Sequence, residues 1–262
     1  MDRTLRLQFL DDYRKIRHAE GRGSDEPAYY LALPYKDLSG RNSSQWDIRG
    51  RSYRHFERKI LRAWEQESKG PLQILDLGAG NGWMSHRLRG HGHMPVALDI
   101  FTDPRDGLLA ARRYSPDLPL IESDFNMLPF AGASFDVIIY NASIHYSPDY
   151  RRTLAEARRC LRPGGRFVII DSPIYKAREH GERMREEKHQ QFKQQYGFRS
   201  DAVPSIEFLD EPAIAELGRD LGIEWQVHRP WHGWNWFLRP WKARLKRRRP
   251  PSQFHILVGT FK

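Results

Sequence analysis

A glycine-rich loop follows an acidic residue early in the chain. The segment reads Ile74-Leu75-Asp76-Leu77-Gly78-Ala79-Gly80-Asn81-Gly82. Glycine tolerates positive φ and lets a ligand approach the backbone closely. A helix that begins after such a loop presents unpaired backbone N–H groups. The segment therefore predicts a ligand site where a short apolar strand passes into a helix.

The glycine spacing separates two classes of ligand. A dinucleotide fingerprint has the form G-x-G-x-x-G, in which the third glycine packs the helix against the strand beneath a pyrophosphate. Here that third position is Trp83, because the glycines are Gly78, Gly80 and Gly82. A bulky indole disfavours a pyrophosphate, and Asp76 would repel one. The pattern favours a cationic ligand that carries an ammonium or a sulfonium group.

Two more acidic residues end neighbouring predicted strands. Asp99 ends the run Val96-Ala97-Leu98-Asp99, where a carboxylate can accept hydrogen bonds from both hydroxyls of a ribose. Asp124 follows the next strand and could accept from an adenine amino group, with Phe125 beside the ring. Since the carboxyl ends of parallel strands meet at one edge of a sheet, we expect the three acids to converge there.

Alternating strands and helices position these residues. We expect strands at 72–77, 95–100, 120–122, 135–140 and 166–171, and helices at 82–89 and 150–161. Such alternation predicts a parallel α/β sheet with right-handed crossovers. The ranges 223–228 and 254–261 are expected to close the sheet.

Residues 72–172 resemble the class I S-adenosylmethionine-dependent methyltransferases. The resemblance is carried by the glycine loop, the Asp99 strand end, Asp124-Phe125, the strand that begins at Phe135, and Leu161-Arg162-Pro163-Gly164-Gly165. It implies a Rossmann-like, seven-stranded, mostly parallel sheet flanked by helices, whose last strand, 254–261, is antiparallel. The most similar group is the small-molecule methyltransferases, which include enzymes of quinone biosynthesis.

The resemblance also implies S-adenosyl-L-methionine as cofactor. Asp76 and the glycine loop would hold its methionine moiety, Asp99 its ribose, and Asp124 with Phe125 its adenine. Arg49 could pair with the methionine carboxylate, and Asn141 could offer its backbone or amide. The expected cofactor-binding residues are Asp76, Gly78, Ala79, Gly80, Gly82, Asp99, Ile100, Asp124, Phe125, Asn141 and Arg49.

Candidate catalytic residues, His145 and Tyr146, follow the fourth strand. Methyl transfer depends mainly on alignment, which can contribute roughly 7–11 kcal/mol, and needs a base only if the acceptor must lose a proton. His145 titrates in a range suited to a general base, or it packs beneath the cofactor as a structural residue. Tyr146 could orient the acceptor or contact the sulfonium methyl.

Two parts of the chain fall outside the common pattern. Residues 1–70 are expected to form a helical lid, in which Tyr35, Trp46, Arg49 and Tyr53 are candidates to line the pocket. Trp46 and Tyr53 could instead only fill the lid core. Residues 71–262 would form the methyltransferase domain, with a helical insertion at 176–221 and a Trp/Arg-rich insertion at 229–252. Tyr175 and His180 are candidates for the acceptor pocket.

The positive charge is concentrated near the C-terminus. The chain has a formal net charge of +10, and no Asp or Glu follows Glu224, whereas nine Lys and Arg residues do. Trp231–Arg249 combines tryptophans with most of these charges. It could contact an anionic membrane or RNA, or its tryptophans could cap the acceptor pocket above a solvated basic hairpin. We favour the membrane over RNA because no known RNA-binding module accompanies the segment, while four prolines argue against one long amphipathic helix.

The rest of the sequence argues against several classes of protein. No run approaches the roughly 20 apolar residues that span a membrane, and Cys160 is the only cysteine. His91 and His93 lack nearby metal-ligating partners, so no metal site is predicted. We expect a cytoplasmic, small-molecule methyltransferase, peripheral to the membrane at most, without a stable protein partner. An RNA methyltransferase and a non-catalytic protein that binds S-adenosylmethionine remain the alternatives.

Overall fold

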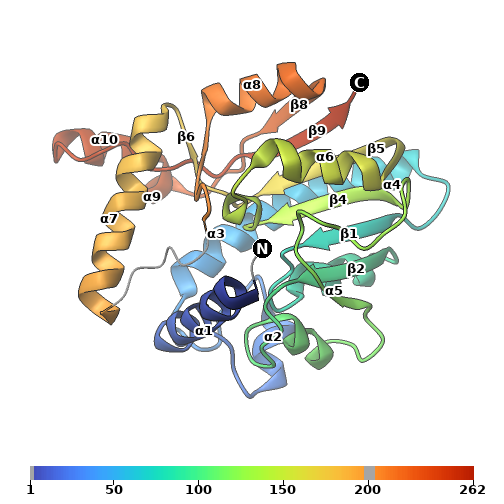
Figure 1. Ribbon diagram of the computed structural model, residues 1–262, viewed down its shortest axis with the longest axis horizontal. Coiled ribbons are helices and arrows are strands. Elements are labelled where there is room, and N and C mark those ends of the chain that lie inside the picture. The colour runs from blue at the N-terminus through green and yellow to red at the C-terminus, as the bar shows by residue number, and fades with distance from the viewer. Residues whose placement is uncertain (1–2, 198–203) are drawn as a thin grey trace.

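The computed structural model describes residues 3–197 and 204–262. Helices cover both faces of a central sheet (Figure 1). Its strands are β1 (Gln73–Leu77), β2 (Met94–Asp99), β3 (Leu120–Glu122), β4 (Phe135–Asn141), β5 (Leu161–Ile170), β8 (Ile223–His228) and β9 (Ile256–Phe261). Their order is β3-β2-β1-β4-β5-β9-β8, and only β9 runs antiparallel to its neighbours. This confirms the predicted seven-stranded, mostly parallel sheet with an antiparallel closing strand.

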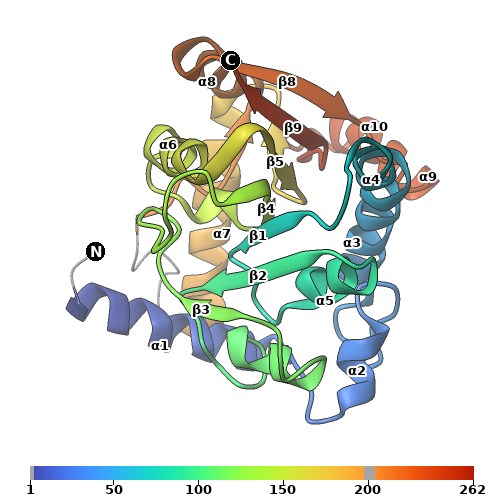
Figure 2. The same ribbon diagram turned by 90° about the vertical axis from the view of Figure 1, so that its right-hand side faces the viewer.

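Alternating side chains of the strands build two apolar layers. In β1, Ile74 packs on one face of the sheet, whereas Leu75 and Leu77 pack on the other. Helices α6 (Tyr150–Cys160) and α8 (Glu211–Leu221) cover the Leu75 side, and α5 (Trp83–Gly90) covers the Ile74 side (Figure 2). Strands that are covered on both faces explain the near-continuous apolar runs in the sequence.

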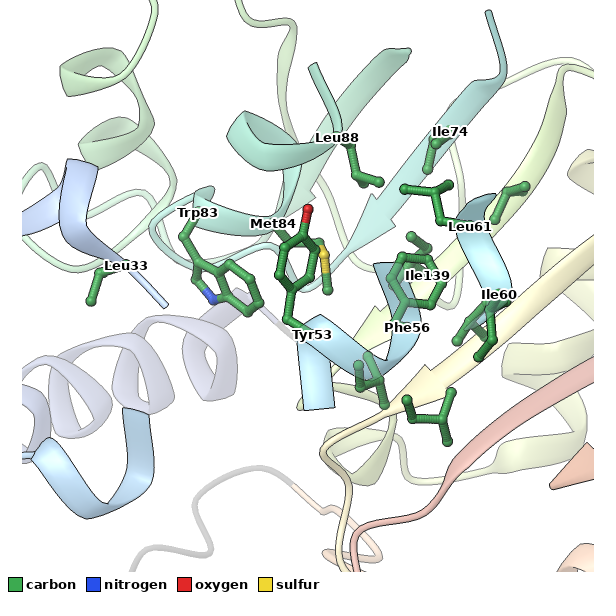
Figure 3. Packing of buried hydrophobic residues seen from close by; sticks show 14 of the residues in the cluster. Leu33, Tyr53, Phe56, Ile60, Leu61, Ile74, Trp83, Met84, Leu88 and Ile139 are labelled. Carbon is green, nitrogen blue, oxygen red and sulfur yellow. The ribbon is translucent and has the colours of Figure 1, made fainter. Parts of the chain in front are cut away.

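The N-terminal helices complete the layer on the Ile74 side. They are α2 (Pro27–Ala32), α3 (Ser43–Phe56), the π-helical turn η1 (Glu57–Leu61) and α4 (Arg62–Glu67). Helix α3, η1 and α4 follow one another without a break, so residues 43–67 form one helix that contains a π-helical turn. Tyr53 and Phe56 pack with Ile74 and Met84 in one buried cluster (Figure 3). These helices therefore form part of the main core of the protein.

Helix α1 (Arg3–Ala19) lies apart from that layer, near the edge where the parallel strands end (Figures 1 and 2). The ring of Tyr13 contacts Phe101 edge-on, with 5.0 Å between centroids, and Tyr146 at 6.2 Å. Arg17 pairs with the buried Asp106. Within the segment expected to form a lid, α1 therefore contacts the ligand-binding edge through Phe101 and Tyr146.

Two insertions stand at the same edge. The first contains β6 (Ile174–Tyr175), α7 (Arg178–Tyr196) and β7 (Leu209–Asp210), and β6 pairs with β7 in a small parallel sheet that the sequence did not predict. Residues 198–203 of the predicted 176–221 insertion lie outside the described residues. The second contains α9 (Trp234–Phe237) and α10 (Arg239–Leu245). Two short helices agree with the expectation that the prolines prevent one long helix.

A buried polar cluster ties the second insertion to the sheet. Ser52 Oγ of α3 donates to Asp171 Oδ1 at 2.5 Å, and it lies 3.0 Å from His232 Nε2. Asp171 directly follows β5, and His232 precedes α9. This cluster joins the N-terminal helices, the end of β5 and the second insertion at one point.

Candidate active site

A cleft of about 510 Å³ lies at the carboxyl edge of the sheet; we call it the cofactor cleft. Loops after β1, β2, β3 and β4 form its floor, and α1 and α3 contribute side chains. Its lining residues include Phe9, Tyr13, Arg17, Trp46, Arg49, Gly78, Ala79, Gly80, Asn81, Asp99, Ile100, Asp124, Phe125, Asn141 and Tyr146. The predicted convergence of strand-end residues is therefore present, although two predicted members, Asp76 and Gly82, do not line the cleft.

The three loop glycines have positive φ but different surroundings. Gly78 has a φ of 69°, and a Cβ there would lie 2.4 Å from the Cβ of Ser143. Gly82 packs in the same way against Ala111, so it serves the junction with α5. At Gly80, with a φ of 54°, a Cβ would meet no atom of the described residues within 4 Å. Its backbone therefore faces open space, where a ligand can approach it.

Asp99 has both carboxylate oxygens anchored by the backbone. Oδ2 accepts from the N–H of Gly80 at 2.7 Å, and Oδ1 accepts from the N–H of Phe101 at 2.8 Å. Burial raises the pKa of this carboxyl above its usual value. A carboxylate offers about four acceptor positions, so two bonds fix its orientation and leave positions for the hydroxyls of a ribose.

Asp124 and Phe125 line the cleft from the loop that follows β3. Asp124 Oδ1 accepts from the backbone N–H of Asn126 at 2.9 Å and from its amide at 2.8 Å. The Phe125 ring meets Tyr140 edge-on with 6.2 Å between centroids. A fixed carboxylate beside an aromatic ring can take an adenine, through its amino group and its face.

Asp76 lies beneath the loop in the protein interior. It has no exposed surface, and its Oδ2 accepts from Ser85 Oγ at 2.7 Å. Its Oδ1 is buried and has no hydrogen-bond partner among the described residues. Burial raises the pKa of Asp76 to about 7. A nearby ammonium would relieve that cost by stabilising the ionised form, so Asp76 remains a predicted contributor although it does not line the cleft.

Arg49 and Asn141 present unpaired polar groups. The Arg49 guanidinium lies 4.9 Å from the centre of the Trp46 ring, and it makes no ion pair with any described residue. Burial lowers its pKa, and Arg22 adds to the effect by repulsion. Asn141 Oδ1 is buried without a partner in the described chain. These groups suit the carboxylate and the ammonium of an amino acid moiety.

His145 and Tyr146 face different spaces. Tyr146 lines the cofactor cleft, whereas His145 lines a second cavity. Their ring centroids lie 4.6 Å apart, and His145 Nδ1 is 3.2 Å from Ser172 Oγ. Burial lowers the pKa of His145 to about 3, with further lowering by Lys188 and Arg49. The imidazole is therefore neutral at pH 7 and a weak base, which does not fit the titration range expected from the sequence.

The second cavity, of about 840 Å³, adjoins the first across these two residues; we call it the basic cavity. Its lining residues include His145, Tyr175, Arg183, Glu187, Lys188, Glu207, Arg239, Lys242, Lys246, Arg247, Arg248 and Arg249. Of the alternative in which tryptophans cap the acceptor pocket above a solvated basic hairpin, the solvent exposure of Lys242, Lys246, Arg247 and Arg248 agrees. The cap does not, because no tryptophan of Trp231–Arg249 lines either space. Cations of the second insertion line the cavity, while Trp231, Trp234 and Trp241 are more than half exposed.

The other pocket candidates divide between site and core. Trp46 lines the cofactor cleft and Tyr175 lines the basic cavity. Tyr53 is fully buried in the core, and Tyr35 is 38% exposed on the surface. His180 lines neither of the two spaces.

Phe9, Tyr13 and Arg17 line the cofactor cleft but were not predicted as site residues. They lie at helical spacing along α1, and that period alone identifies a buried face without saying what covers it. Their place at the cleft depends on how α1 folds back over the sheet.

Neither a metal cluster nor a membrane-spanning helix is present in the part of the chain that the structure describes. Within residues 3–197 and 204–262, no three or more His, Cys, Asp or Glu side chains are grouped so as to hold a metal ion. In the same residues, no helix is long and apolar enough to cross a membrane.

Comparison with known families identifies the kind of domain that β1 to β5 belong to. Residues 75–169 match the family described as the methyltransferase domain. The match begins in β1 and ends in β5, so it contains the glycine loop, Asp99, Asp124 and the His145 loop. Together with the observed sheet order, it identifies this part of the chain as a class I S-adenosylmethionine-dependent methyltransferase domain.

Curated relatives match the same region. The chain is 37% identical over 98 residues to malonyl-[acyl-carrier protein] O-methyltransferase of Erwinia pyrifoliae, which covers 37% of this chain and 36% of the relative. It is 33% identical over 116 residues to demethylmenaquinone methyltransferase of Mycolicibacterium vanbaalenii, which covers 42% and 49%. The chain thus spans about a third to a half of the length of these relatives.

Solved structures share the fold over a longer span. The PH0226 protein of Pyrococcus horikoshii has a TM-score of 0.53 at 21% identity, covering 80% of this chain and 91% of that protein. An S-adenosylmethionine-dependent methyltransferase of Mesorhizobium loti has a TM-score of 0.51 at 18% identity, covering 76% and 95%. At these identities the likeness establishes the fold.

Proposed function

We propose that this chain transfers a methyl group from S-adenosylmethionine to a small-molecule acceptor. The observation that carries the proposal is the cofactor cleft, where the anchored Asp99, the open backbone at Gly80 and the unpaired Arg49 meet at one edge. The names of the curated relatives, methyltransferases of malonyl-[acyl-carrier protein] and of demethylmenaquinone, support an acceptor other than nucleic acid.

The residues present fit the parts of the cofactor. Asp99 would accept from the ribose hydroxyls, Asp124 and Phe125 would hold the adenine, and Arg49 would pair with the methionine carboxylate. When bound, S-adenosylmethionine supplies a methyl group on a sulfonium, which is displaced by the acceptor nucleophile to leave the neutral thioether S-adenosylhomocysteine. Tyr146, as the cleft residue next to the basic cavity, is suited to orient the acceptor.

His145 is proposed as a positioning residue. Its low pKa makes it a poor base at pH 7. Its ring lies beside Tyr146 and is held near Ser172 Oγ, so it can fix the wall between the two spaces. Alignment of acceptor and donor is the main catalytic contribution available to such a site.

The test uses S-adenosylmethionine with a labelled methyl group. The protein is incubated with the small-molecule fraction of a cell extract and, separately, with total RNA. The expected result is label in a small molecule, lost in the Asp99→Ala variant. Label in RNA would establish the RNA alternative. Cofactor binding without label in either fraction would favour the non-catalytic alternative.

We propose in addition that the second insertion contacts an anionic membrane surface. The supporting observation is a set of exposed apolar side chains on and beside α9 and α10, here called the aromatic surface: Trp231, Trp234, Phe237, Leu238, Trp241 and Leu245. Indoles favour the headgroup boundary, and nearby Lys and Arg residues add about 1 kcal/mol each at anionic lipids.

Co-sedimentation with vesicles tests the membrane contact. The expected result is binding to vesicles that contain phosphatidylserine but not to vesicles of phosphatidylcholine alone. Binding should fall when Trp234 and Trp241 are replaced by Ala, whereas Trp225→Phe, away from this surface, is the control. Equal recovery in the supernatant with both vesicle types, together with tight salt-dependent RNA binding, would contradict the proposal.

A further inference from the structure

The basic cavity contains far more positive than negative charge. Eight of its lining residues are Lys or Arg, and two are Glu. Glu207 accepts from Lys188 at 2.9 Å, and Glu187 pairs with Arg249 at 2.6 Å. Within the described chain the other cations have no carboxylate partner: Arg183, Arg239, Lys242, Lys246, Arg247 and Arg248.

These cations come from separate elements that converge. Arg183 belongs to α7, whereas Lys242 and Lys246 belong to α10 or directly follow it, and Figure 1 shows the two helices on the same side of the sheet. Arg239 Nη1 is buried and has no hydrogen-bond partner among the described residues. Bringing like charges together is unfavourable unless an anion compensates them. Five of the six unpaired cations are exposed to solvent, yet all six line the same cavity: Arg183, Arg239, Lys242, Lys246, Arg247 and Arg248, of which Arg239 is the half-buried one.

Helix α10 separates two kinds of side chain. Lys242, Ala243 and Lys246 line the cavity, whereas Trp241 and Leu245 are 67% and 86% exposed. Lys242 and Lys246 therefore occupy a different face of α10 from Trp241 and Leu245, and both lysines line the cavity while remaining exposed to solvent. Their placement calls for an anion inside the cavity, in addition to any anions of a membrane.

The cavity is separated from the cofactor cleft by consecutive residues. His145 lines the first and Tyr146 the second. A volume of about 840 Å³ is within the range of small-molecule sites. A ligand held here could extend a nucleophile past Tyr146 toward the methyl group.

From this arrangement we infer that the basic cavity binds a phosphate-class group of the methyl acceptor, so that the substrate is a phosphorylated small molecule or a phospholipid-like amphiphile. The inference rests on the proposed methyl transfer for the role of the ligand, but the binding itself can be measured separately. Multiply charged phosphates match Lys and Arg donors through charge-assisted hydrogen bonds.

The experiment uses inorganic pyrophosphate as probe in isothermal titration calorimetry, with and without saturating S-adenosylhomocysteine. The expected result is saturable binding of pyrophosphate that does not displace S-adenosylhomocysteine. Replacing Lys242 and Lys246 with Gln should weaken pyrophosphate binding about tenfold or more. The matched control replaces Arg229 and Arg244 with Gln; these residues lie outside the cavity lining, and the affinity should change by less than about twofold.

The lipid source is distinguished with soluble short-chain lipids. Dihexanoyl phosphatidic acid and dihexanoyl phosphatidylcholine are titrated below their aggregation concentrations. Tighter binding of phosphatidic acid than of pyrophosphate would indicate that the methyl acceptor is a phospholipid-like amphiphile. Tighter binding of pyrophosphate would indicate a water-soluble phosphorylated acceptor. Binding of pyrophosphate and of phosphatidic acid should be weakened in the variant that lacks Lys242 and Lys246 and kept in the control.

Several outcomes would overturn the inference. These are absence of saturable pyrophosphate binding, equal weakening in the cavity variant and its control, and displacement of S-adenosylhomocysteine by pyrophosphate. Failure of S-adenosylhomocysteine to bind a protein that still binds pyrophosphate would instead contradict the proposed function. Unchanged S-adenosylhomocysteine affinity of both double variants shows that each is folded.

Discussion

The buried Asp76 gives the protein a specific dependence of stability on pH. Its pKa is raised from an ordinary value of 3.8 to about 7 because burial disfavours the ionised form. The native state therefore holds a proton on this group at pH values where the unfolded chain has lost it. By linkage, this contribution to stability is present below pH 4 and is lost as the pH rises through about 7.

The Asp76→Asn variant should lack this dependence, because a carboxamide does not titrate. From the two pKa values, the free energy of unfolding of the wild type relative to the variant should fall by about 3–4 kcal/mol between pH 4 and pH 8. Urea denaturation across this range, without added cofactor, measures the difference. Asp117→Asn, at a side chain that is 77% exposed, is the control for a carboxylate that is not buried.

A constant difference between wild type and Asp76→Asn would refute the reasoning, because it would mean that Asp76 is ionised throughout. Calorimetry adds a second readout at pH 7. If the cofactor ammonium stabilises ionised Asp76, binding of S-adenosylhomocysteine should release roughly half a proton in the wild type and none in the variant. Measurements in buffers of different ionisation enthalpy report that release.

Two further substitutions test the site. His145→Ala should lower methyl transfer while leaving S-adenosylhomocysteine affinity within about threefold. It should also lose less stability on acidification than the wild type. The depression of the His145 pKa from 6.5 to about 3 costs the wild type about 1.5 kcal/mol of unfolding free energy between pH 6.5 and pH 5. Fully retained turnover in a folded His145→Ala variant would show that His145 does not position the reactants. Arg49→Met should weaken S-adenosylhomocysteine binding at least tenfold but leave adenosine binding unchanged, because adenosine has no carboxylate. Equal weakening of both ligands would show that Arg49 supports the fold of the cleft instead.

Local patterns were sufficient to predict the sheet. The runs at 120–122 and 223–228 coincide with β3 and β8, because short apolar segments between turns leave few alternatives. The parallel direction of β1 to β5 followed from the alternation of strands with helices. The strands β6 and β7 were missed because each has two residues, and their pairing is fixed by tertiary contacts that no periodicity records.

The candidate site could be predicted only where it lies on that sheet. Gly78, Gly80, Asp99 and Asp124 reach the cleft because they end or closely follow strands. Asp76 was expected at the ligand, but its side chain enters the interior on the α5 side, where Ser85 holds it. Composition identified the basic insertion, yet its role as the wall of a cavity depends on the packing of α7 and α10, which are far apart in the sequence.

Binding of S-adenosylhomocysteine to the wild type and to Asp99→Ala tests the central claim most directly. The Asp99 carboxylate is oriented by the N–H groups of Gly80 and Phe101, so its loss should remove charge-assisted bonds to the ribose. We predict saturable 1:1 binding to the wild type, weakened by about 1.5–3 kcal/mol in the variant, and no binding of NAD to either protein. Absence of S-adenosylhomocysteine binding to the folded wild type, or binding of NAD in its place, would contradict the assignment of the cleft.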